Sequence, residues 1–174
     1  MRWFYYLILA LLAVLLQSTV VQVLWFRTGS GWTGPDVVAA VAIFVGLSAR
    51  TSLDAALAGW LAGMALDLTL TGGGMGLLGL LYAGACAAIV HLRHAMLRDK
   101  ALTQFILGLL FCLFVYGPWM LYQQIISPAS SLGSQALQVL GVALTTALLT
   151  PLVVAALKRV QRFLIPAGSA RERM

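Results

Sequence analysis

The amino-acid sequence predicts an all-α integral membrane protein: a six-transmembrane-helix bundle with both termini in the cytoplasm. Composition is the first reason, since 61% of the residues are hydrophobic and 9% are charged, whereas about a quarter of the residues of a soluble domain are charged. The second reason is that the chain contains six apolar stretches, and a helix of about 20 apolar residues crosses a bilayer. The third is charge: if the stretches cross in turn, ten of the eleven Lys and Arg residues lie on one side, and only Arg27 lies on the other. The positive-inside rule identifies the crowded side as the cytoplasm.

These stretches occupy nearly the whole chain, so we expect a single membrane domain, 1–174, without a separate soluble domain. The expected helices are 3–26, 36–49, 53–70, 75–92, 101–126 and 133–157, followed by a basic cytoplasmic tail at 158–174. The first stretch follows Arg2 as a secretory signal would, but it is longer than a signal core and no small-x-small cleavage motif follows it. We therefore expect a retained helix.

Polar residues late in this first helix, among them Gln17 and Gln22, can form hydrogen bonds between helices. We interpret them as a stripe that faces the rest of the bundle. A stripe that binds a partner protein is the alternative.

The second stretch is the shortest. Pro35 and Asp36 are typical of a helix start, where proline needs no amide hydrogen and a carboxylate complements the amide dipoles. The fifteen residues 35–49 rise only about 22 Å at about 1.5 Å per residue. This helix must therefore borrow flanking residues, thin the bilayer or be sheltered by its neighbours.

The third stretch carries Gly59, Gly63 and Asp67 at intervals of four residues, so the three share one helix face. Its two glycines would let another helix approach closely, either within the bundle or from a partner. An intramembrane carboxylate is costly unless it is paired, hydrated or turned inward. We expect Asp67 to accept backbone amides of the glycine-rich turn that follows; a partner contact and an ion or substrate ligand are the alternatives. The turn glycines are Gly72, Gly73 and Gly76.

The basic residues at the cytoplasmic helix ends form an expected rim that attracts anionic lipid. Its candidate members are Arg93, Arg98, Lys100, Lys158, Arg159 and Arg162. The net charge of +6 is explained by this rim, so no nucleic-acid partner is expected. In the fifth helix, we interpret Tyr116, Trp119 and Tyr122 as anchors at the membrane interface.

No catalytic constellation is recognisable in the sequence. The five acidic residues are scattered, and neither a nucleophile with its base nor a glycine-rich phosphate loop is present. His91 and His94 are three residues apart but lack further ligands at a metal-binding spacing. Cys86 and Cys112 lie in the middle of separate helices, where they act as small apolar side chains. We expect neither enzyme activity nor a cofactor.

Several short motifs, in this order and spacing, resemble the MreD family of bacterial rod-shape-determining membrane proteins over nearly the full length of the chain. They are Leu15-Leu16-Gln17, Pro35-Asp36, the stretch GWLAGMALDL at 59–68, Met75-Gly76, the basic helix end with Arg93, Arg98 and Lys100, and Pro151 followed by KRVQRF at 158–163. The turn between Asp67 and Gly76 is one residue longer than is typical of that family and lacks its proline.

The resemblance implies a non-catalytic scaffold subunit of the cell-elongation machinery that supports lateral cell-wall synthesis. Its implied direct partner is the single-pass protein MreC, and through MreC the MreB filament, RodA and a penicillin-binding transpeptidase; self-association is a further expectation. Docking would use the Gly59 and Gly63 face and the basic rim. The family is also similar in helix count and size to the substrate-binding subunits of energy-coupling-factor vitamin transporters. The alternative function is therefore a small-molecule or lipid-precursor binding subunit of a membrane transporter.

Overall fold

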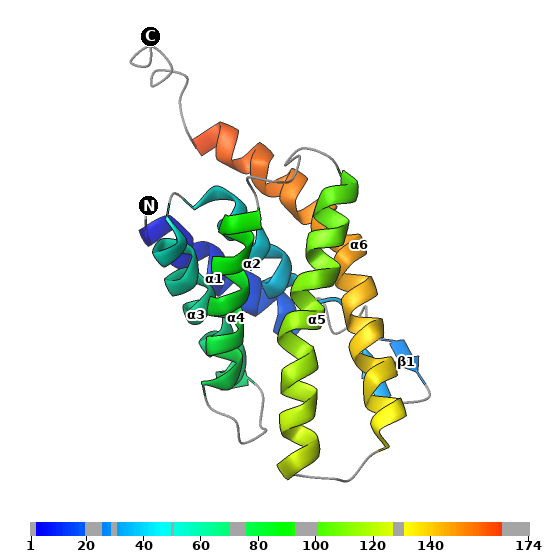
Figure 1. Cartoon of the computed structure of the whole chain (residues 1–174). Coiled ribbons are helices and arrows are strands. Elements are labelled where there is room, and N and C mark those ends of the chain that lie inside the picture. Colours follow the sequence, from blue (N-terminus) through cyan, green and yellow to red (C-terminus); the bar gives the residue numbers. More distant parts are fainter. Residues whose placement is uncertain are drawn as a thin grey trace.

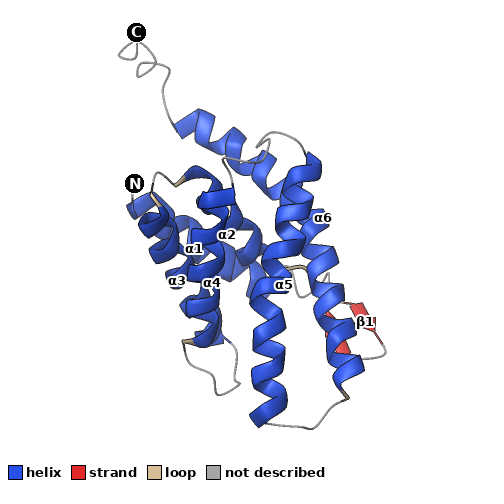
Figure 2. Cartoon of the chain, in the orientation of Figure 1, coloured by secondary structure: helices blue, strands red, loops and turns tan. Residues whose placement is uncertain are grey.

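The computed structural model describes residues 3–19, 26–28, 31–49, 51–69, 76–92, 101–126 and 131–164 (Figure 1). In these ranges the chain forms six helices and one short antiparallel hairpin in which Phe26 pairs with Thr33 (Figure 2). The elements are α1 (Trp3–Thr19), β1 (Phe26–Thr28), β2 (Gly31–Thr33), α2 (Val37–Ser48), α3 (Ser52–Thr69), α4 (Leu77–Leu92), α5 (Ala101–Ile126) and α6 (Leu132–Leu164). The predicted helical class is confirmed, whereas the hairpin was not expected from the sequence.

The predicted helix bounds are close for α2 to α5 and wrong at two places. The first helix does not continue to residue 26, because Phe26 belongs to strand β1 and is paired with β2. The last helix does not end at residue 157, because α6 continues to Leu164 through residues with good helix propensity. Pro166, which disfavours helical backbone just before it, lies only two residues further on.

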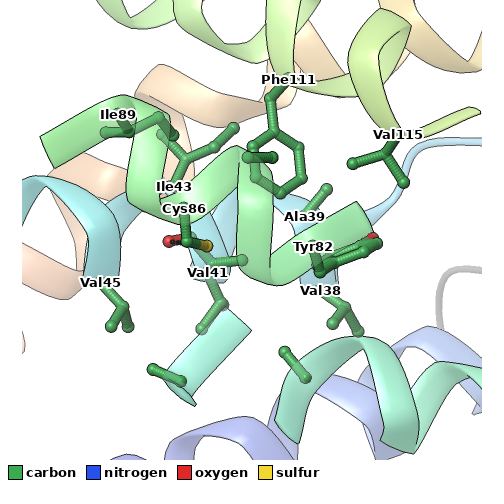
Figure 3. Packing of buried hydrophobic residues seen from close by; sticks show 14 of the residues in the cluster. Val38, Ala39, Val41, Ile43, Val45, Tyr82, Cys86, Ile89, Phe111 and Val115 are labelled. Atoms are coloured by element: carbon green, nitrogen blue, oxygen red, sulfur yellow. Dashed lines mark hydrogen bonds between the residues drawn. The ribbon is translucent and has the colours of Figure 1, made fainter. Parts of the chain in front are cut away.

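Helix α2 lies at the centre of the molecule and contacts all five other helices. Ten of its 12 residues are buried. Figure 3 shows three of its valines and Ile43 near side chains of α4 and α5, including Ile89 and Phe111. At about 1.5 Å per residue α2 is about 18 Å long, well short of a hydrocarbon core of about 30 Å. The neighbouring helices shelter α2, which is one of the three possibilities that its short length left open.

Two antiparallel helix pairs pack beside α2, and each pair depends on glycine. A Cβ atom on Gly59 or Gly63 of α3 would lie 2.6 Å from a backbone carbonyl oxygen of α4. In the second pair, a Cβ atom on Gly108 of α5 would lie 2.8 Å from Thr150 Oγ1 and 3.0 Å from Ala147 Cα, both of α6. Because only glycine permits such close approach, α3–α4 and α5–α6 are each tightly joined.

The outer faces of the helices carry large apolar side chains at helical spacing. On α5 these are Leu102, Ile106, Leu110 and Phe114, and on α6 they are Leu140, Leu144, Leu148 and Leu152. Similar stripes lie on α1 and α3. Two helical segments, Ala101–Ile126 and Leu132–Arg159, are long and apolar enough to cross a membrane, and only 28% of each apolar window is buried.

Candidate functional site

The most unusual buried group is the carboxylate of Asp36, which is only 2% exposed. Asp36 is the N-cap of α2: its backbone is extended, and its Oδ1 accepts a hydrogen bond from the Ala39 amide over 3.0 Å. Asp is one of the preferred N-cap residues because its side chain satisfies an amide that has no partner inside the helix. The helix was expected over 36–49 with Pro35 and Asp36 at its start; Asp36 is the cap, and the helix itself begins at Val37.

The second carboxylate oxygen of Asp36 is held by two tyrosines from different helices. The Tyr82 hydroxyl of α4 donates to Asp36 Oδ2 over 2.5 Å, and the Tyr116 hydroxyl of α5 donates to the same oxygen. The expected role of Tyr116 as an interface anchor is therefore wrong, because its hydroxyl points into the bundle. A tyrosine hydroxyl in an apolar interior needs a hydrogen-bond partner, and a buried carboxylate oxygen is a strong acceptor.

Helices α1 and α6 complete the cluster through the backbone on either side of Asp36. Gln17 of α1 donates from Nε2 to the Pro35 carbonyl over 3.2 Å and accepts the Val37 amide at Oε1 over 2.8 Å. Thr146 of α6 accepts the Asp36 amide at Oγ1 over 2.8 Å. The structure thus places Gln17 against the bundle, as the sequence interpretation proposed, whereas Gln22 lies outside the described residues.

The side-chain oxygens of Asp36 accept three hydrogen bonds from neutral donors, and the group lies at the N-terminal end of α2, where the amide dipoles favour an acidic side chain. Hydrogen bonds to a charged group are stronger than those between neutral groups. Asp36 therefore joins several helices through hydrogen bonds, some made by its side chain and some by its backbone. We call the set Asp36, Tyr82, Tyr116, Thr146 and Gln17 the Asp36 cluster.

Asp67, the carboxylate singled out in the sequence, lies outside the Asp36 cluster, at the connection between α3 and α4. Its Oδ2 accepts the Gly76 amide over 2.9 Å and the Gly79 amide over 3.4 Å. Gly76 has φ +96°, a left-handed conformation that a residue with a side chain rarely adopts. Asp67 therefore ties the end of α3 to the start of α4. Gly72 and Gly73 lie outside the described residues.

The glycine face of α3 is covered by α4. Both Gly59 and Gly63 are buried there, with backbone atoms of α4 where a side chain would be. The sequence left open whether this face packs against a helix of the same chain or against a partner. In the structure it packs against a helix of the same chain. The face is not available for a partner helix while α3 and α4 stay paired.

The basic rim is described only in part. Lys158 is half-buried and Arg159 is exposed near the end of α6. Arg162 belongs to the same helix, but its side chain is outside the described part. Arg93, Arg98 and Lys100 lie in the undescribed range 93–100. Within the described residues there is no group of three or more His, Cys, Asp or Glu side chains that could hold a metal ion.

Only part of the Asp36 cluster has a sequence signal. A Pro-Asp pair directly before a run of apolar residues predicts a capped helix start, which is what Asp36 provides. Nothing in the sequence connects Tyr82 or Tyr116 to it, because they lie 46 and 80 residues further along. No family model matches the chain, and neither does any curated protein or solved structure.

Proposed function

We propose that the chain is a multi-pass protein of the bacterial cytoplasmic membrane whose six helices form one membrane domain. The main support is the outer surface, where large apolar side chains form stripes on α1, α3, α5 and α6. Many exposed large apolar side chains are unfavourable in water and favourable against lipid tails. The buried carboxyl group of Asp36 bonds internally, as a membrane interior requires.

Both termini lie on the cytoplasmic side in this proposal. The start of α1 and the end of α6 point toward the same end of the molecule, and so do the end of α4 and the start of α5 (Figure 1). The basic residues of the expected rim belong to these ends. The positive-inside rule then orients this end toward the cytoplasm.

Within the membrane, the chain serves as a non-catalytic scaffold subunit of the cell-elongation complex and binds MreC directly. This proposal rests on the resemblance to the MreD family. The packing is compatible with a scaffold, because the centre of the molecule is filled by α2 and its apolar neighbours. Since the Gly59 and Gly63 face is occupied by α4, the partner helix would contact the outer apolar stripes.

Copurification tests the scaffold proposal. The chain and MreC are co-expressed, extracted in mild detergent and purified through a tag on one of them. The expected result is a stable complex that is lost when the transmembrane helix of MreC is replaced by an unrelated helix. An unrelated six-helix membrane protein of similar size is the control bait. Absence of a complex, both in detergent and after cross-linking in cells, would refute the proposal.

The same preparation separates the scaffold from the transporter alternative. A protein that binds a small molecule in its folded state is stabilised by that molecule, so its melting temperature rises. We expect no rise with a panel of vitamins and lipid-linked cell-wall precursors. A reproducible, concentration-dependent rise with one compound, together with failure to bind MreC, would favour a binding subunit of a transporter.

A further inference from the structure

The Asp36 cluster lies between two parts of the molecule that are each joined internally by close packing. In one part, α3 and α4 meet at Gly59 and Gly63, and α2 packs on α4 at Gly46, where a Cβ atom would lie 3.2 Å from Ile89 Cγ2. In the other part, α5 and α6 meet at Gly108. We call these parts the α1–α4 body and the α5–α6 pair.

The two parts meet where α2 packs against α5 and α6, where α4 packs against α5 and where β2 lies against α6. At this last contact a Cβ atom on Gly141 of α6 would lie 3.0 Å from Thr33 Cγ2. Tyr82 of α4 meets Phe111 of α5 edge to face, with ring centroids 5.2 Å apart and ring planes at 83°. A Cβ atom on Gly84 of α4 would lie at an ordinary distance of 3.7 Å from the ring of Phe114 of α5. Such apolar contacts are non-directional, so they allow sliding and separation more readily than interlocked backbones do.

Asp36 makes two hydrogen bonds that connect the α5–α6 pair to the α1–α4 body. Tyr116 of α5 donates to the Asp36 carboxylate, and Thr146 of α6 accepts the Asp36 amide over 2.8 Å. Asp36 itself is fixed to the body by the Tyr82 hydroxyl and the Ala39 amide. One residue therefore fastens both helices of the pair.

We propose that the α5–α6 pair moves away from the α1–α4 body as one unit when its hydrogen bonds to Asp36 break. We call the interface between these two parts the seam, and Asp36, which holds it closed, the latch. In an apolar layer a lost hydrogen bond is not replaced by water, so the closed state depends strongly on these two contacts. The seam, rather than either glycine-packed pair, is the place where this chain changes shape.

The native cysteines report on the seam without added labels. Cys112 is on α5, one helical turn before Tyr116, and is fully buried. Cys86 is on α4, one turn after Tyr82, and is fully buried inside the α1–α4 body, where its thiol donates to the Ala42 carbonyl of α2. Opening of the seam should expose Cys112 and leave Cys86 covered.

The experiment measures the rate at which N-ethylmaleimide modifies each cysteine of the purified full-length chain, resolved by peptide mass spectrometry. In Tyr116→Phe the Cys112 rate should rise about tenfold or more, as expected for the loss of a buried hydrogen bond. Adding Thr146→Val, which removes the acceptor of the Asp36 amide, should raise the rate further. The Cys86 rate should stay within about twofold of wild type, because the packing of the body is intact.

Two matched variants serve as controls. Tyr122→Phe removes a hydroxyl from the same helix outside the Asp36 cluster. Thr145→Val removes a hydroxyl that donates within its own helix, to the Gly141 carbonyl over 2.8 Å. Both should label like wild type.

An unchanged Cys112 rate in the cluster variants would overturn the latch. A parallel rise at both cysteines would overturn it too, because that pattern means general loosening. If the double variant does not fold, Tyr116→Phe alone is judged by the same criteria. No partner protein is present, so the outcome is independent of the proposed binding to MreC.

Discussion

Tyr82 donates its hydroxyl hydrogen to Asp36 over 2.5 Å, although the two residues are 46 positions apart and belong to different helices. The bond joins the start of the central helix α2 to the middle of α4. Together with Tyr116 and Thr146 it makes Asp36 the residue to which three helices are fastened.

Replacing Asp36 by Ala should lower the free energy of unfolding by about 3 kcal/mol or more, because each buried donor left without an acceptor costs about 1–3 kcal/mol. The donors concerned are the Tyr82 and Tyr116 hydroxyls and the Ala39 amide. Asp36→Asn keeps an acceptor oxygen and should lose less. Unfolding of the detergent-solubilised chain by heat or denaturant measures both.

The control for this prediction is Asp54→Asn, at the half-buried first turn of α3. It changes only a favourable interaction with the helix amides, so we expect a loss of about 0.5 kcal/mol. Equal losses for Asp36→Ala and Asp54→Asn would contradict the structural role of the Asp36 cluster.

Gly63→Ala should disrupt the α3–α4 pair, because the new Cβ atom would lie 2.6 Å from the Leu78 carbonyl oxygen and 2.7 Å from Gly79 Cα. These are backbone atoms that cannot move aside without shifting a helix, so a loss of about 1–3 kcal/mol follows from overpacking. Gly84→Ala on α4 is the matched control, since its nearest contact is an ordinary 3.7 Å.

In a helix interior Ala is favoured over Gly by about 0.5–1 kcal/mol. Gly84→Ala should therefore raise the melting temperature while Gly63→Ala lowers it. If both variants move the melting temperature in the same direction, the close approach at Gly63 is not a determinant of stability.

Asp67→Ala should weaken the connection between α3 and α4 by about 1–2 kcal/mol, because the Gly76 amide loses its acceptor. Thr69→Val is the control: its hydroxyl donates to the Leu66 carbonyl of the same helix and its side chain is exposed. Limited proteolysis near the turn, compared between the two variants, provides the measurement. The expected pattern is faster cleavage in Asp67→Ala only; no difference would argue against the turn-fixing role.

The proposed orientation places Ser131, just before α6, outside the cell and Arg159, near the end of α6, in the cytoplasm. Reagents added from outside should therefore reach only the first position. Ser131→Cys should react with a membrane-impermeant maleimide in intact spheroplasts, and Arg159→Cys should react only after the membrane is permeabilised. Both are made in a Cys86→Ala, Cys112→Ala background, where no native thiol remains. The reverse pattern would place the basic residues outside, against the positive-inside rule.

The sequence alone was sufficient for the helical class and for the approximate position of most helices. The bounds of α5 agree with the predominantly apolar run from Ala101 to Ile126, because the segments on either side of it are polar or rich in turn-forming residues. The start of α2 was also recognisable, since Asp36 caps the helix through atoms only three residues apart. These features depend on neighbours along the chain, which is the information that a sequence pattern contains.

Only the tertiary structure decided what Asp36 does. Its bonds to Tyr82, Tyr116 and Thr146 join positions far apart in the sequence, and hydrophobic periodicity carries no information about such pairs. The same holds for Gly59 and Gly63: their spacing predicts a face for close packing, but the identity of the neighbouring helix follows from how six helices share one core. Side-chain periodicity determines which face of a helix is apolar, whereas the contacts that this face makes are determined by the packing of the whole chain.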